Sequence, residues 1–215
     1  MEWTGFEEIG GKQIAPGIVR WVAFHPEWKE DVACAAINPG GHLVLVDPLL
    51  PAGPEGEAAL RGLEALGEPP AIVLTVFFHE RSAGDIADRI AGTTLWVEHA
   101  GVANVKSLVT NPFQAGDHLP GSLVAFATAR ADEIVLWDPA SQSLIVGDVM
   151  LGRGPRGIEL CPDSWLPDGI GTSDLARSLL PLLDLPVARI LPGHGEPVVQ
   201  DAASRLKSLL GETGP

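Results

Sequence analysis

The sequence predicts an α/β protein in which two sheets carry helices on their outer faces. The first observation is an alternation of apolar runs and helical stripes over residues 42–98, which reads β-α-β-α-β. The second is a series of strand-like runs with short polar connections between residues 122 and 148. The third is composition: 46% of the residues are hydrophobic and 20% are charged, which is enough for a core. Because no low-complexity linker divides the chain, we expect one domain over residues 1–215.

The elements of the first half follow from apolar periodicity. Pro26 interrupts a strand-like run, because proline has no backbone N–H to donate. The Pro-Gly-Gly sequence at residues 39–41 predicts a hairpin turn. Leucines spaced three residues apart predict a helix over residues 57–66. The expected strands are 18–24, 32–38, 42–50, 71–78 and 93–98, and a second helix is expected at 82–90.

The second half changes character, with more hairpins and fewer crossovers. Residues 152–168 form a stretch rich in Gly and Pro, which predicts a long loop of the kind that often carries function. Pro181 lies inside a helical stripe and predicts a kink there. The expected strands are 122–128, 133–138, 143–148 and 188–191, and the expected helices are 174–185 and 198–210.

The main candidate site is a polar segment at the end of a buried strand. The apolar run over residues 71–78 is followed at once by His79, Glu80 and Arg81. Ser82, with an acidic residue three positions later, predicts a helix start, because the hydroxyl can accept a free backbone N–H. Open α/β sheets usually place their chemistry at the carboxyl ends of strands. The segment therefore puts three functional side chains where a site is expected.

Charge and cysteine content exclude several classes of partner. The formal net charge is -14, and a surface that acidic repels phosphate backbones and anionic lipid. No apolar run is long enough to span a membrane, and the acidic N-terminus does not read as a signal peptide. Cys34 and Cys161 do not make a disulfide framework. We therefore expect a cytoplasmic protein with a small-molecule ligand and with neither nucleic-acid nor membrane partners.

Four short motifs, in this order, resemble the metallo-β-lactamase superfamily. They are an early strand ending Val-Asp-Pro, a strand ending Leu-Thr before a polar turn, a hairpin ending Gly-Asp, and Leu-Pro-Gly-His-Gly. In this chain they lie at residues 44–48, 74–75, 147–148 and 191–195, and so cover nearly the whole sequence. The resemblance implies a four-layer αββα sandwich with the active site along one edge.

The resemblance also implies two metal sites, and the first has lost its ligands. The family carries Thr-His-x-His-x-Asp-His, and counting from Thr75 puts Val76 and Phe78 at the two histidines of site 1. The third histidine of that site falls near Ala129. None of these side chains has a lone pair for zinc. We expect Phe78 to fill the space of an imidazole and its ion.

The second metal site keeps more of its chemistry. By the same count it consists of Glu80, Arg81, Asp148 and His194. Arg81 cannot be a ligand, because it only donates. Buried carboxylates need a positive partner, which is either a metal held by Glu80, Asp148 and His194 or the guanidinium itself. Because a metal and an arginine in one small site repel, we favour Arg81. His79 is a spare residue that could supply an extra ligand or transfer a proton.

The presence of each of these residues can also be explained by a purely structural role. Asp148 and His194 fit a turn and a loop kept for the fold, and His79 fits a satisfied histidine. Glu80 and Arg81 fit a surface ion pair worth about 0–1 kcal/mol, although the end of a strand favours a buried pair.

Three functions follow, and the sequence leaves them open. The first, which we favour, is a metal-free, non-hydrolytic relative, a pseudoenzyme that keeps a small-molecule cleft. The second is a hydrolase of ester or thioester bonds with one zinc, iron or manganese ion on Glu80, Asp148 and His194, with His79 as a further ligand. The third is acid–base chemistry by His79 or His194, with Arg81 binding an anionic group.

Overall fold

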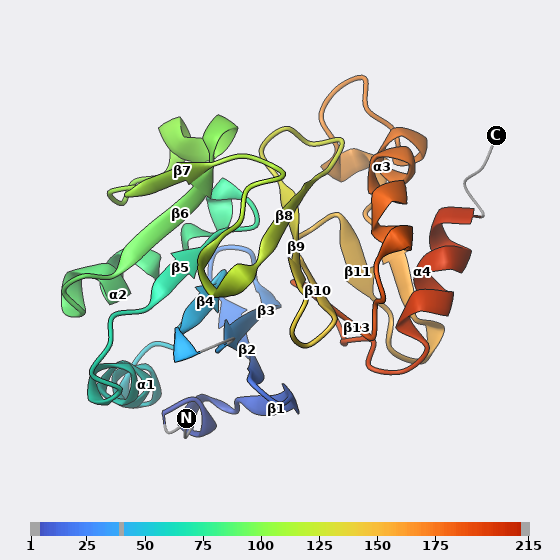
Figure 1. Cartoon of the computed structure of the whole chain (residues 1–215). Coiled ribbons are helices and arrows are strands. Elements are labelled where there is room, and N and C mark those ends of the chain that lie inside the picture. Colours follow the sequence, from blue (N-terminus) through green and yellow to red (C-terminus); the bar gives the residue numbers. More distant parts are fainter. Residues whose placement is uncertain (1–4, 39–40, 212–215) are drawn as a thin grey trace.

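A computed structural model describes residues 5–38 and 41–211 as four layers. Figure 1 shows α1 and α2 on the outer side of the first sheet, and α3 and α4 on the outer side of the second sheet. The four helices are α1 (Pro54–Ala65), α2 (Ala83–Arg89), α3 (Thr172–Leu179) and α4 (Ala202–Gly211). None of the helices in the described ranges is long and apolar enough to cross a membrane. The predicted α/β class and αββα layering are confirmed.

The first sheet has seven strands in sequence order. β1 to β4 are antiparallel neighbours, and β4 to β7 are parallel neighbours joined by crossovers that include α1 and α2. This order is the β-α-β-α-β pattern of the sequence, preceded by a meander. The strands are β1 (Lys12–Ala15), β2 (Ile18–His25), β3 (Glu30–Ile37), β4 (Val44–Val46), β5 (Ala71–Val73), β6 (Thr94–Glu98) and β7 (Asn111–Phe113).

The second sheet has four strands in the order β13-β10-β9-β8. β8, β9 and β10 are antiparallel, and β13 pairs in parallel with β10. A separate two-stranded hairpin of β11 and β12 follows β10. The strands are β8 (Val124–Ala127), β9 (Ile134–Asp138), β10 (Ser143–Val146), β11 (Met150–Gly152), β12 (Ile158–Leu160) and β13 (Arg189–Pro192).

Three apolar cores hold the four layers together. The middle core lies between the sheets and includes Ile18, Val44, Val73, Leu136 and Ile145. The outer cores lie between each sheet and its helices. Strands that are covered on both faces read as continuous apolar runs, which is why β4, β9 and β10 are buried throughout.

Backbone contacts between the two sheets set the edge where the candidate site lies. The N–H of Ile134 donates to the carbonyl of Thr75 at 2.9 Å, and the N–H of Ala33 donates to Gly193 at 2.7 Å. Residue 75 follows β5 and residue 193 follows β13. The ends of strands from the two sheets therefore meet at one place.

Several sequence predictions need correction. The strand expected at 71–78 ends at Val73, because the chain leaves the sheet and forms a 3-10 helix, η3 (Phe77–Glu80). The hydroxyl of Ser82 does not cap α2 but accepts the N–H of Leu50 at 2.9 Å.

Other predictions differ in the extent of elements. The stretch 152–168, expected as loop, contains β12 and two short 3-10 helices. The kink expected at Pro181 is confirmed, because α3 ends at Leu179 and continues as a 3-10 helix to Asp184. The predicted turn at 39–41 lies largely outside the described residues.

Candidate metal centre

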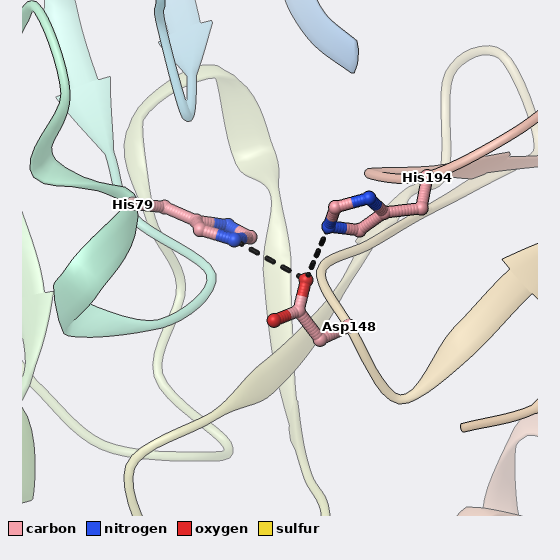
Figure 2. A group of neighbouring side chains, drawn as sticks. All are labelled: His79, Asp148 and His194. Atoms are coloured by element: carbon pink, nitrogen blue, oxygen red, sulfur yellow. Dashed lines mark ion pairs between the residues drawn. The ribbon is translucent and has the colours of Figure 1, made fainter. Parts of the chain in front are cut away.

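Three side chains from distant parts of the chain converge at the edge between the sheets. Figure 2 shows the imidazoles of His79 and His194 pointing at the carboxylate of Asp148 from two sides. Nε2 of His79 and Nε2 of His194 each lie 3.2 Å from the same oxygen, Oδ1 of Asp148. His79 belongs to η3, Asp148 follows β10, and His194 follows β13. Each residue sits just beyond the carboxyl end of a strand, where such sites are expected.

The loop that carries His194 depends on glycine. Gly193 donates its N–H to Val146 at 2.7 Å, and the N–H of Gly152 donates to the carbonyl of His194 at 2.9 Å. Gly195 has a φ of 80°, and a Cβ there would collide with the carbonyl of Gly152. The motif Leu-Pro-Gly-His-Gly therefore reflects a tight backbone as well as a candidate ligand.

Asp47 fixes the orientation of His79. Its Oδ2 lies 2.9 Å from Nδ1 of His79 and accepts the hydroxyl of Thr75 at 2.5 Å, while Oδ1 accepts the N–H of Thr75 at 2.8 Å. A carboxylate on Nδ1 favours a proton there and leaves Nε2 free to act toward Asp148. His194 has a looser equivalent, since its Nδ1 lies 3.8 Å from Oε2 of Glu30.

The buried charges shift one another's ionisation. Burial alone would lower the pKa of His79, but the carboxylates of Asp47 and Asp148 outweigh it and raise the pKa to about 9. Burial also opposes ionisation of Asp148, yet the facing His79 and His194 hold the pKa of that carboxyl below its usual range. The cluster is thus built around a positive charge, carried either by a proton or by a metal ion.

Two buried atoms in this cluster lack hydrogen-bond partners. They are Nε2 of His79 and Oδ1 of Asp148, whose 3.2 Å separation lacks hydrogen-bond geometry. One ligand atom from each of His79, Asp148 and His194 lies within 4.8 Å of the other two. A tetrahedral zinc with bonds of about 2.0–2.1 Å separates neighbouring donors by roughly 3.3 Å. The two 3.2 Å separations match that spacing and the third pair of donor atoms lies within 4.8 Å, so the donor set is one that a single metal ion can take.

Aromatic side chains surround the three residues. The ring of Trp28 lies 5.8 Å from the ring of His79, and the ring of Phe78 lies 5.1 Å from it. The ring of Trp165 lies 5.8 Å from that of His194 and is 40% exposed. Trp28 and Phe78 also line a groove of about 1330 Å³. The centre is therefore shielded from water on several sides, which strengthens electrostatic interactions within it.

Neither a protein-family model nor a curated protein matches this sequence. Solved structures do match over most of the chain. The DIM-1 metallo-β-lactamase matches with a TM-score of 0.69 at 16% identity, covering 95% of this chain and 97% of that one. The chain has the metallo-β-lactamase fold. A metallo-β-lactamase from Pontibacter korlensis gives 0.67 at 16% identity, covering 94% and 98%. A metallo-β-lactamase family protein from Thermus thermophilus gives 0.66 at 17%, covering 93% and 80%.

Within this metallo-β-lactamase fold, Glu80 does not join the centre as expected. Its carboxylate accepts the N–H groups of Lys106 and Ser107 at 3.0 and 2.6 Å, and it also accepts the hydroxyl of Ser107. These contacts lower the pKa of Glu80 despite its partial burial. In the 3-10 turn His79 points inward instead, and it is His79 rather than Glu80 that faces Asp148.

Arg81 does not supply the cation that the sequence led us to expect. Its Nη1 donates to the carbonyls of Asp47 at 2.9 Å and Ala33 at 3.3 Å, and its Cζ lies 5.6 Å from the centre of the Trp28 ring. Among the described residues the guanidinium has no carboxylate within ion-pair distance, so the predicted Glu80–Arg81 pair is wrong. Arg81 instead ties the edge of the first sheet to Trp28.

The positions that the motif count assigned to a first metal site carry apolar groups, and another arginine lies beside them. Val76 pairs with Glu133 as an isolated bridge, and Phe78 lies 5.4 Å from the guanidinium of Arg130. Sequence reasoning missed Asp47, Arg130 and Glu133 as parts of the centre. A signal for Asp47 was available, because it lies in the Val-Asp-Pro motif already noted in the early strand.

Proposed function

We propose that this chain binds one divalent metal ion through His79, Asp148 and His194 and uses it to hydrolyse an ester or thioester. The observation that carries the proposal is that Nε2 of His79, Oδ1 of Asp148 and a nitrogen of His194 converge within 4.8 Å, and that the first two atoms are buried without a hydrogen bond. A buried polar atom without a partner costs roughly 1–3 kcal/mol, so native proteins rarely keep one without a reason. A metal ion would satisfy both atoms at once.

Three protein ligands leave a coordination position open, as in catalytic rather than structural zinc sites. A divalent ion at this place supplies Lewis acidity and lowers the pKa of a water molecule. Asp47 holds the ring of His79 in one orientation and places its Nδ1 proton. Trp28 and Trp165 flank the centre, limit water and offer apolar surface to a substrate. The acidic protein disfavours strongly anionic substrates, so we propose an uncharged small molecule.

Metal content tests the proposal directly. Protein purified without chelator should carry close to one zinc, iron or manganese ion per chain by elemental analysis. His194→Ala removes one of three ligands and should reduce metal affinity by about 100-fold or more, because three ligands are the minimum for a tight site. His99→Ala, which changes a histidine outside the centre, is the matched control and should keep its metal. Less than a tenth of an ion per chain, even after incubation with zinc, would end the proposal.

A second candidate is the metal-free relative with a ligand-binding cleft. The specific observation in its favour is that Val76, Phe78 and Ala129 leave the first metal site without ligands, while Arg130 packs on Phe78. In that case His79 has a structural role, because its buried ring forms ion pairs with both Asp47 and Asp148.

Hydrolysis separates the two candidates. A panel of aryl esters and thioesters should be hydrolysed by the zinc-loaded protein, and a chelator should abolish the activity. A metal-loaded protein with no turnover of any member of the panel would favour the binding protein over the hydrolase.

A further inference from the structure

We infer that Glu133 is a positioning residue for Asp148, and that Arg130 holds Glu133 in place. Glu133 thereby sets the geometry and affinity with which the centre takes a metal ion. The inference rests on the proposed metal site, but its contacts exist within the chain itself and can be tested without metal.

Glu133 holds the backbone of the turn that carries Asp148. Its side chain is completely buried, and Oε1 accepts the N–H of Asp148 at 2.6 Å and the N–H of Val149 at 2.9 Å. A carboxylate that accepts two adjacent N–H groups fixes the peptide planes on either side of Asp148. The side chain of Asp148 is then directed toward His79 and His194.

Gly147 makes this arrangement tight. A Cβ at residue 147 would lie 2.5 Å from the hydroxyl of Thr75 and 2.9 Å from Oε1 of Glu133. The turn is therefore clamped between Thr75 and Glu133. Because Thr75 also donates to Asp47, which orients His79, one network positions two of the three ligands. Ligands held by such outer contacts bind metals more tightly, since less order is lost on binding.

Arg130 makes it possible to keep a buried carboxylate at this place. Its Nε lies 3.4 Å from Oε2 of Glu133, and the Arg130 side chain is only 10% exposed. Its Nη1 donates to the carbonyl of Trp165 at 3.4 Å, and its guanidinium lies over Phe78. A buried acid without such a cation would be costly. Arg130 thus packs on Phe78, at a position where the motif count expects a histidine, and supports Glu133.

Two substitutions distinguish the effect of the charge on Glu133 from the effect of the position of its acceptor oxygen. Glu133→Gln removes the charge but keeps an acceptor oxygen at the same reach. Glu133→Asp keeps the charge but withdraws the acceptor by one methylene. Asp138→Ala is the matched control, because Asp138 is a buried acid at the other end of β9 that accepts the N–H of Ala140 at 3.0 Å. It weakens the same hairpin without touching the turn of Asp148.

Amide exchange in the chelated protein is the first measurement. The amides of Asp148 and Val149 should stay protected in the unsubstituted protein, in Glu133→Gln and in the Asp138→Ala control. They should lose protection in Glu133→Asp. Unchanged protection in Glu133→Asp would overturn the inference, and so would equal loss in the control. A protein that takes up no metal would end the proposed function but leave this comparison valid.

Cobalt binding is the second measurement. Glu133→Asp should raise the Kd for Co²⁺ by about 10- to 100-fold and change the visible absorption bands that report coordination geometry. Glu133→Gln and Asp138→Ala should leave both close to those of the unsubstituted protein. The reverse pattern, with Glu133→Gln impaired and Glu133→Asp intact, would assign Glu133 a charge role and overturn the positioning role.

Discussion

Within the centre, the orientations of the Asp47 and His79 side chains are held by the largest number of hydrogen bonds described above. The carboxylate of Asp47 accepts two bonds from Thr75 and faces Nδ1 of His79, so neither side chain has an alternative orientation. Asp47 itself has a φ of 49°, a left-handed conformation that aspartate and asparagine tolerate better than most residues. A substitution of Asp47 by asparagine therefore preserves the backbone, but it removes the charge and also replaces one of the two acceptor oxygens with an N–H donor.

We predict that Asp47→Asn weakens zinc binding by about 10- to 100-fold, as loss of an outer carboxylate on a ligating histidine typically does. Competition with a zinc chelator of known affinity measures this. Glu80→Gln is the control: its contacts are with Lys106 and Ser107, so zinc affinity should not change. Weaker zinc binding in Glu80→Gln would restore the ligand set that the motif count first indicated.

At the scale of elements, the turns after strands decide where the three side chains of the centre meet. The strands β5, β10 and β13 are mostly apolar, and the polar side chains of the centre follow only after each strand stops. The turn after β13 lies against Gly152 of β11, which leaves no room for a side chain at Gly195. Packing between two turns, rather than either strand alone, thus places His194.

We predict that Gly195→Ala lowers the free energy of unfolding by well over 2 kcal/mol, because left-handed strain adds to a collision with Gly152. Gly10→Ala is the comparison. Gly10 has a φ of 73° but no atom within 4 Å of the new Cβ, so only strain of about 1–2 kcal/mol is expected. Urea denaturation of both variants measures the difference. Equal losses of unfolding free energy in the two variants would show that the turn at Gly195 moves to make room for the methyl group.

At the scale of the whole molecule, buried charge makes stability depend on pH. His79 is completely buried, and its pKa rises from 6.5 to about 9 on folding without metal. Below pH 6.5 the imidazole is protonated in both states, and its stabilising effect is complete. Between pH 6.5 and 9 the folded state keeps a proton that the unfolded state releases, so stability falls as pH rises.

We predict that the chelated protein loses on the order of 3 kcal/mol of stability between pH 6.5 and 9, at about 1.4 kcal/mol per pKa unit. Denaturant unfolding at several pH values in EDTA measures this loss. His79→Asn should flatten the dependence, and saturating zinc should weaken it, because metal replaces the proton on Nε2. A chelated protein with equal stability at pH 6.5 and 9 would place the positive charge elsewhere.

More of the fold than of the candidate site could be predicted from the sequence. The αββα layering and most elements were predictable, because apolar periodicity reports burial and Gly or Pro reports turns. Short edge strands such as β1 and β7 were missed, since three or four residues carry too little pattern. Asp148 and His194 were identified as candidates, and the structure brings them together. Glu80 and Arg81 were placed in the centre by counting, but the structure binds Glu80 to Lys106 and Ser107 and Arg81 to backbone carbonyls.

By itself, the sequence determined which apolar segments enter the two sheets and which polar groups follow them, although not the residue at which each strand ends. It also placed Val76 and Phe78, which have no lone pairs, at the positions where the motif count expects histidine ligands. Only the tertiary structure decided that His79 faces Asp148. The direction of a side chain in a short 3-10 turn depends on contacts with Asp47 and Thr75, which lie elsewhere in the chain and leave no local pattern.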